Sequence, residues 1–292
     1  MIELTIGVFA FVFGATIGSF LNVCISRWPA GGSIVAPRSR CPHCGTAIAW
    51  YDNIPMVSWL LLRGRCRTCR ARISLQYPAV ELAVALLWLW AVVAYGPSFT
   101  ALRIAVFATL LLGIAITDAR HFLIPDGFTV FGLIWVLATA VIGWFLASNG
   151  MFAPPLAAVL GACTGAGAIA IVGWLGEIAF RREAMGFGDV TLMAFAGAAL
   201  GPGRALLTIF LGAVLALVGL LIMRAVGMRE DFGVAADTHT AGEKSSLTPE
   251  AVGSSRHVPF GVFLAPAAII ALVWGDALIT WYTQWIRTGA LT

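Results

Sequence analysis

Two acidic residues could carry out chemistry, because each lies at the end of an apolar segment. Asp118 follows the apolar run 100–117, and Asp189 stands just before the apolar run 190–201. A carboxylate at the edge of a bilayer is costly and usually marks function. Two carboxylates about 3 Å apart share a proton, so one can deprotonate water while the other polarises a scissile carbonyl. The pair predicts an aspartyl protease dyad, and the residues alone leave an ion or proton relay as the alternative.

The residues beside these aspartates have predicted roles of their own. Gly186 and Gly188 flank Phe187 directly before Asp189. We expect them to leave room for a peptide backbone and to permit unusual φ/ψ angles. Asp126, which follows Ile124-Pro125, is interpreted as a helix cap.

Four cysteines form two close pairs, Cys41-Pro42-His43-Cys44 and Cys66-Arg67-Thr68-Cys69. Four thiolates suit tetrahedral Zn²⁺, and in a reducing compartment this spacing favours a metal over disulfides. Such a site is coordinatively full, so we expect it to fold a small domain rather than to do chemistry. The alternative is a pair of redox dithiols, but no thioredoxin-like pattern accompanies them.

The elements that must position these groups are membrane spans. The chain is 60% hydrophobic and 11% charged, whereas a soluble domain carries roughly 25% charge. A spanning helix needs about 20 apolar residues, and eight segments come close: 2–24, 78–96, 100–117, 127–147, 155–180, 190–201, 204–224 and 259–282. The predicted fold is therefore an all-α polytopic membrane protein of about eight helices, with a small zinc-binding module after the first.

We expect three parts in the chain. Residues 1–26 form the first transmembrane helix, 27–76 the cytoplasmic Cys₄ module, and 77–292 the remaining bundle with a polar cytoplasmic loop at 228–257. When the module is placed in the cytoplasm and the spans alternate, 15 of the 18 Lys and Arg residues are cytoplasmic. The other three, Arg103, Arg204 and Arg287, lie on the outer side. This obeys the positive-inside rule, puts both termini outside and brings the two aspartates to the cytoplasmic edge.

The arginines around the second cysteine pair predict contact with anionic lipid. Nucleic acid is not expected as a partner, because no aromatic residues alternate with these basic ones as single-strand binding would need. A less favoured interpretation is that the arginines handle a nucleotide-like cofactor.

The ordered motifs resemble a known family over nearly the full length. Gly186-Phe187-Gly188-Asp189 is similar to the GxGD motif of presenilin-type membrane proteases. With Gly18-Ser19-Phe20-Leu21-Asn22-Val23, the cysteine pairs and the stretch from Asp118 to Asp126, it resembles the bacterial bifunctional prepilin peptidases. The resemblance assigns the protease dyad to Asp118 and Asp189.

The same resemblance implies a substrate, a second activity and a location. The substrates are type IV prepilins or type II secretion pseudopilins, whose basic leader is removed at the inner membrane. The new N-terminal residue is then methylated with S-adenosylmethionine. A peptidase-only homologue is the alternative.

The methyl-donor site is harder to locate, because the sequence has no glycine-rich βαβ fingerprint. The candidates are Asn22, Arg27 and Glu81. Glu81 lies inside a span and needs a partner, for which Arg27 or an arginine of the module is suggested. A structural ion pair that docks the module is the competing interpretation.

Three features depart from the family pattern. Thr191 stands where the family usually has Lys, Val262 stands where Pro is common, and the 228–257 loop is longer than expected.

Overall fold

The computed structural model describes residues 2–148, 150–181, 185–225 and 259–288. The predicted loop at 228–257 lies outside these residues. The described chain is helical, with long helices α1 (Ile2–Arg27), α3 (Gln76–Tyr95), α4 (Phe99–His121), α5 (Asp126–Phe145), α6 (Pro155–Phe180), α7 (Phe187–Leu200), α8 (Pro202–Ala225) and α9 (Gly261–Thr288). Each of the eight predicted segments is therefore a helix, which confirms the all-α membrane fold.

Seven of these helices are long and apolar enough to cross a bilayer, and α7, at 14 residues, is the exception. Its Ala- and Gly-rich sequence has a packing reason. A Cβ on Gly161 of α6 would collide with the carbonyl oxygen of Gly197 in α7. The two backbones therefore touch, which only small residues allow. The second half of α7 is almost completely buried as a result.

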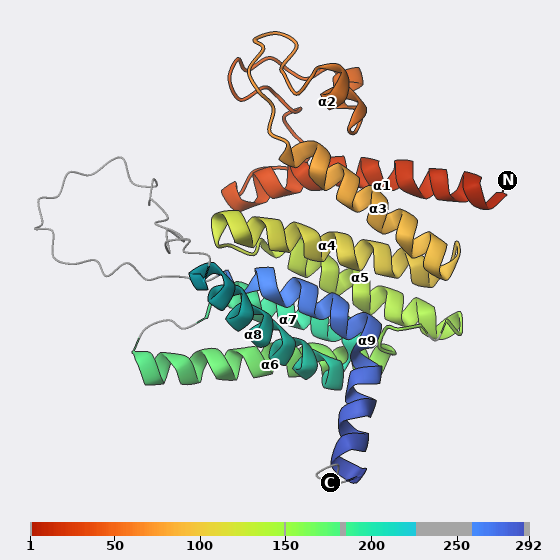
Figure 1. Cartoon of the computed structure of the whole chain (residues 1–292), viewed down its shortest axis with the longest axis vertical. Helices are drawn as coiled ribbons and strands as arrows, with labels where there is room; N and C mark the ends of the chain where they lie inside the picture. The colour runs from red at the N-terminus through yellow and green to blue at the C-terminus, as the bar shows by residue number, and fades with distance from the viewer. Residues whose placement is uncertain (1, 149, 182–184, 226–258, 289–292) are drawn as a thin grey trace, which may run out of the picture.

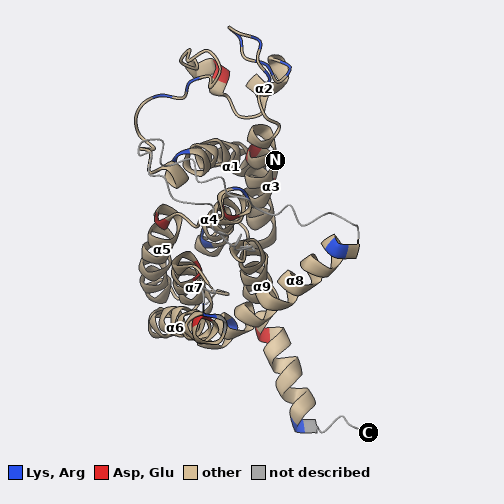
Figure 2. Cartoon of the chain, turned by 90° about the vertical axis from the view of Figure 1, so that its left-hand side faces the viewer, with Lys and Arg blue, Asp and Glu red and all other residues tan. Residues whose placement is uncertain are grey.

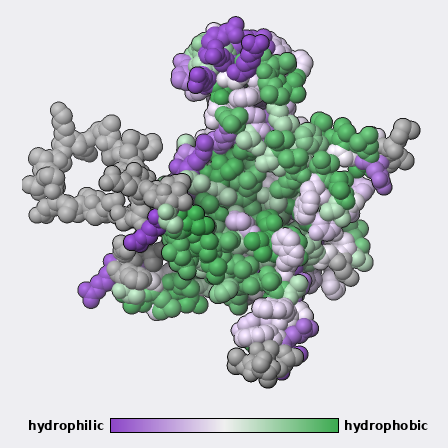
Figure 3. Space-filling model, in the orientation of Figure 1, coloured by the Kyte–Doolittle hydropathy of each residue, from purple (hydrophilic) through white to green (hydrophobic). Residues whose placement is uncertain are grey.

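The helices form one bundle around α4, which contacts α1, α3, α5 and α9. Figure 1 shows α1 and α3 at one edge of the bundle, α6 and α8 toward the other, and the C-terminal half of α9 projecting from it. In the space-filling view the helices present a mostly apolar surface (Figure 3). The charged residues gather at helix ends and in the segment after α1 (Figure 2). These features are those of a bundle solvated by lipid.

The cysteine-bearing segment forms a separate lobe beyond α1 and α3, and this lobe is hydrophilic at its tip (Figure 3). It contains two short 3₁₀ turns, Trp28–Ala30 and Trp50–Asn53, and the five-residue helix α2 (Val57–Leu61). Apart from these, its backbone is irregular, with two isolated bridges at Arg40–Ala47 and Arg65–Arg72. A lobe with so little regular structure needs another source of stability, and a metal held by four cysteines would supply it.

Candidate functional site

Asp118 lies in the last turn of α4 and is only 5% exposed. Its Oδ2 atom accepts a hydrogen bond of 3.1 Å from the backbone N–H of Val262, the second residue of α9. A Cβ on the neighbouring Gly261 would come within 2.9 Å of the same oxygen. The start of α9 therefore packs directly onto the Asp118 carboxyl group, and only glycine fits there.

Asp189 lies in the first turn of α7 and is half-buried. Ile124, in the connection between α4 and α5, links it to Asp118. Its side chain would meet a Cβ placed on Gly188 at 2.9 Å and one placed on Gly261 at 3.0 Å. Asp118 and Asp189 are also close enough for the charge of one to act on the other. The structure thus brings the two predicted aspartates together at one end of the bundle.

The two glycines before Asp189 do different things. Gly188 is packed against Ile124, whereas a Cβ on Gly186 would meet nothing nearer than the Gly188 nitrogen at 4.0 Å. Gly186 is therefore exposed and unobstructed by the described residues around it. The expectation of unusual backbone angles is wrong, because Gly186 has φ −76° and neither glycine is among the residues with positive φ.

The prediction that Asp126 caps a helix is also wrong. Pro125 holds the N-cap position of α5, and no side chain caps that end. Asp126 is instead the first residue of α5, where its negative charge interacts favourably with the positive end of the helix dipole. Thr191, at the position of the missing Lys, donates its hydroxyl to the Gly188 carbonyl oxygen over 3.0 Å.

The four paired cysteines meet in the lobe, and their Sγ atoms all lie within 4.8 Å of one another. The Sγ atoms of Cys41 and Cys69 are 3.7 Å apart. Tetrahedral Zn²⁺ with bonds of about 2.3 Å separates its sulfur ligands by about 3.8 Å. The donor set and its dimensions fit a structural metal ion.

The two cysteine turns share one backbone pattern. Cys41 N–H donates to the Thr46 carbonyl oxygen and Cys66 N–H to that of Ala71, while Gly45 and Arg70 return bonds to the two cysteine carbonyls. Both returning residues have positive φ, 70° and 61°. Hydrogen bonding from Thr46 lowers the pKa of Cys44 to about 6. This shift favours the thiolate, the form that a metal binds.

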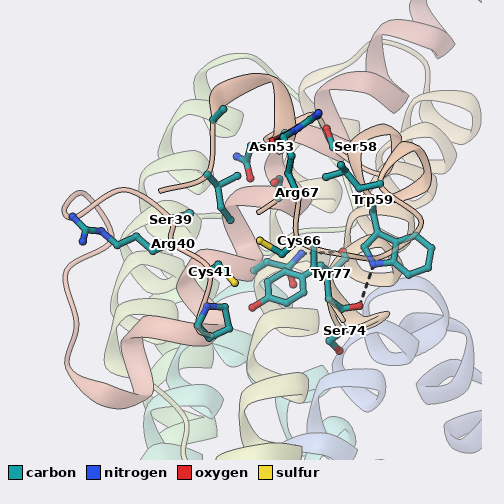
Figure 4. A pocket seen from close by; sticks show the side chains of 18 of the residues that line it. Ser39, Arg40, Cys41, Asn53, Ser58, Trp59, Cys66, Arg67, Ser74 and Tyr77 are labelled. Atoms are coloured by element: carbon teal, nitrogen blue, oxygen red, sulfur yellow. Dashed lines mark hydrogen bonds and ion pairs between the residues drawn. The ribbon is translucent and has the colours of Figure 1, made fainter. Parts of the chain in front are cut away.

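A cavity of about 640 Å³ lies between the lobe and the helices α1 and α3 (Figure 4). The three predicted methyl-donor residues, Asn22, Arg27 and Glu81, all line it, together with Cys41 and Cys66. The cavity therefore joins the cysteine cluster to the bundle. Its volume lies within the range of about 300–1,000 Å³ that is usual for small-molecule sites.

The suggested Arg27–Glu81 pair is not formed. Arg27 donates to the carbonyl oxygens of Ser33 and Pro37, at 2.9 and 2.8 Å. Glu81 Oε2 accepts the backbone N–H of Met56 at 2.7 Å. The arginine is used to hold the chain after α1, and a backbone amide, not a cation, connects Glu81 to the lobe.

Several site features were not expected. The hydrogen bond from the Val262 N–H to Asp118 cannot be read from the sequence, because every residue except proline carries a backbone N–H. Arg67 forms an ion pair with Asp52 at 2.6 Å, and this contact lowers the pKa of Asp52. Both residues line the cavity; Arg67 is one of the arginines around the second cysteine pair, whereas nothing in the sequence pointed to Asp52.

Comparisons with known proteins cover most of the chain. Residues 12–95 match the bacterial peptidase A24 N-terminal domain, and residues 105–221 match the type IV leader peptidase family. A prepilin leader peptidase/N-methyltransferase from Stutzerimonas stutzeri is 35% identical over 95% of this chain and 94% of its own. One from Pseudomonas aeruginosa is 33% identical over 94% and 92%. One from Myxococcus xanthus is 40% identical over 75% of this chain and 64% of its own. No solved structure matches with comparable significance.

Proposed function

The chain belongs to the bacterial prepilin leader peptidase/N-methyltransferases of the peptidase A24 family, and from this we propose that it performs both reactions. It removes the leader from type IV prepilins or type II secretion pseudopilins, and it methylates the new N-terminal residue. The observation that carries the peptidase half is the meeting of Asp118 and Asp189 beside the open space at Gly186.

In the peptidase reaction the two carboxyl groups share one proton. The ionised group takes a proton from water, and the water oxygen attacks the scissile carbonyl carbon. The protonated group donates to the carbonyl oxygen as charge develops there. When the carbon–nitrogen bond breaks, a proton passes to the leaving amine and the pair returns to its starting state. The Val262 N–H holds Asp118 in place throughout.

The position of the pair suits a membrane-anchored substrate. Both aspartates lie at helix ends, not at the middle of a span, which favours a protease over the relay alternative. A prepilin has a polar leader and an apolar helix, so its cleavage site lies at a membrane surface. We assign this surface to the cytoplasmic side of the inner membrane, because most Lys and Arg then fall on that side.

The four cysteines would hold one Zn²⁺ ion, whose role is to join the two turns of the lobe. Elemental analysis of the purified protein should find about one zinc per chain. Metal-free protein with four reactive thiols would refute this assignment.

The cavity would hold the methyl donor, S-adenosylmethionine, which supplies an electrophilic methyl group when bound. Its lining supports this, since Arg40 and Arg72 suit a carboxylate and Tyr51 and Trp59 offer aromatic faces. Asn22, Arg27 and Glu81, the residues predicted for this site, line the same cavity on its helix side, whereas the donor itself is assigned to the lobe side with Arg40, Arg72, Tyr51 and Trp59.

The direct test is mass spectrometry of a prepilin coexpressed with this chain. We expect both loss of the leader and the added mass of one methyl group. Asp118→Asn and Asp189→Asn should each abolish leader removal without unfolding the protein. Normal cleavage by either variant would reject the dyad, and cleavage without methylation by the unaltered protein would make it a peptidase-only homologue.

A further inference from the structure

The helix side of the cavity presents a buried amide oxygen that lacks a partner and a buried carboxyl group that has no cationic partner among the described residues. Asn22 and Glu81 are 4% and 8% exposed, and both line the cavity. The amide nitrogen of Asn22 donates to the Tyr77 carbonyl oxygen at 3.0 Å. Its Oδ1 atom is buried without a hydrogen-bond partner in the described part of the chain. The Tyr77 carbonyl thus sets the orientation of the amide and leaves its acceptor atom unsatisfied.

Glu81 is also held in place, by contacts to its backbone and to its carboxyl group. A Cβ on Gly18 would lie 2.7 Å from the Glu81 Cα atom, so α1 and α3 are in backbone contact at this level. From the lobe, the Met56 N–H reaches Glu81 Oε2, and Met56 has the rare φ of 58° at the start of α2. Helices α1 and α3 therefore meet at the Glu81 backbone, and the lobe contacts its carboxyl group.

No Lys, Arg or His among the residues that the structure describes forms an ion pair with the Glu81 carboxyl group. Arg27 is occupied by two carbonyl oxygens and Arg67 by Asp52. Figure 4 shows Arg67 on the lobe, Tyr77 below it, and Arg40 to the left with its side chain extending away from the other labelled residues. A buried carboxylate and an unpaired amide oxygen cost free energy unless a donor binds to them. Their chemistry calls for a positively charged group that carries N–H bonds.

We propose that Asn22 Oδ1 and Glu81 bind the new N-terminal ammonium group of the cleaved pilin, the acceptor of the methyl group. This inference rests on the proposed function. The helix side of the cavity is formed by α1 and α3 of the membrane bundle, in which the pilin's apolar helix would also lie, whereas the lobe side carries Arg40 and Arg72, which suit the donor's carboxylate.

In the methyl transfer, Glu81 serves as the proton acceptor. The ammonium loses one proton to the Glu81 carboxylate and becomes an amine. The amine nitrogen forms a bond to the methyl carbon while the carbon–sulfur bond of the sulfonium breaks, which leaves a neutral thioether. The product is a secondary ammonium, and Glu81 releases its proton to solvent.

The test separates the acceptor from the donor. The full-length protein in detergent is given a synthetic peptide that already begins at the mature N-terminus, so prior cleavage is not needed. Glu81→Gln keeps an acceptor for Met56 N–H, and Asn22→Leu keeps the volume of the side chain. We expect each to lower kcat/KM for the acceptor peptide by about tenfold or more, as loss of a hydrogen bond to a charged group predicts.

Three controls make the result specific. Binding of S-adenosylmethionine by equilibrium dialysis should stay within about twofold, and prepilin cleavage should persist, which shows that the variants are folded. An N-acetylated peptide, which lacks the charge, should bind the unaltered protein at least about tenfold more weakly than the free-amine peptide. This last measurement needs no variant.

The outcomes are distinct. Unchanged kcat/KM in both variants, equal binding of the acetylated peptide, or loss of donor binding with an unchanged KM for the peptide would each overturn the inference while leaving the methyltransferase function intact. If the unaltered protein cleaves prepilin but methylates no free-amine peptide, the methyltransferase half fails and the inference fails with it.

Discussion

The backbone N–H of Val262 donates a hydrogen bond of 3.1 Å to Asp118 Oδ2, although the two residues are 144 positions apart. This contact ties the end of α4 to the start of α9. Val262 stands where the family commonly has proline, and a proline at this position could not make the bond because it has no N–H.

The first prediction concerns this bond. Val262→Pro should lower the rate of prepilin cleavage by roughly tenfold, which corresponds to one hydrogen bond to a charged group. It should not abolish cleavage, since the Gly261 backbone also reaches the Asp118 carboxyl group. Proline is tolerated in the first turn of a helix, so α9 should still form. Val262→Ala retains the N–H and is the control. Equal rates for both variants would show that the bond does not matter for catalysis.

The second prediction concerns Gly261, where a Cβ would lie 2.9 Å from Asp118 Oδ2 and 3.0 Å from Ile124 Cδ1. Gly261→Ala must therefore displace the carboxyl group, and a misplacement of about 1 Å can cost about 100-fold in rate. Gly203→Ala is the matched control, because its Cβ would meet only Ile279 Cδ1 at 3.8 Å. The measurement is the cleavage rate of a prepilin in detergent, and a normal rate for Gly261→Ala would contradict the packing.

The third prediction separates the two activities through the metal. Cys41→Ser, or removal of the proposed zinc ion by a chelator, should collapse the lobe that forms one side of the cavity. Methyl transfer should then fall by at least about tenfold, whereas leader cleavage should stay within about twofold, because structural metal sites contribute folding energy locally. Cys163→Ser is the control, as Cys163 lies in α6 outside the cluster. An equal loss of both activities would mean that the lobe also supports the peptidase.

The fourth prediction tests the contact between α1 and α3. Gly18→Ala places a Cβ 2.7 Å from Glu81 Cα, a backbone atom that cannot move aside cheaply. We expect the helices to separate and methyl transfer to drop, while the aspartate pair on α4 and α7 is undisturbed. Gly7→Ala, whose Cβ would meet only the flexible end of Leu89 at 3.3 Å, should behave as the unaltered protein. Both activities are measured on the same preparation.

The fifth prediction concerns stability at the other end of α4. Arg103 is 4% exposed, has no ion pair within the described ranges, and lies 4.2 Å from the centre of the Phe152 ring. A desolvated cation–π contact contributes about 2 kcal/mol. Phe152→Leu should therefore lower the free energy of unfolding by about that amount, and Arg103→Met should restore much of it in the double variant, since two apolar side chains then meet. Thermal unfolding in detergent measures both.

The helices, the cysteine cluster and the two aspartates could be predicted from the sequence, because each depends on residues that are close together along the chain. The eight apolar segments follow from hydropathy, and each is a helix because an unpaired backbone is too costly in lipid. The cysteine cluster follows from two CxxC turns, each of which places two thiols within reach over four residues. The two aspartates were identified for a similar reason, as charges beside apolar runs.

Other features depend on which surfaces meet, and only the tertiary structure decides that. Arg27 and Glu81 lie at one cavity yet do not pair, because Arg27 donates to two backbone carbonyl groups and the Met56 N–H binds one oxygen of Glu81. The glycine beside Asp189 serves packing against Ile124 and not backbone freedom. The Val262 contact crosses 144 residues and uses a main-chain N–H, which every residue type except proline carries. A group that nearly all residues share leaves no trace in a sequence, so its partner becomes known only when the helices are packed together.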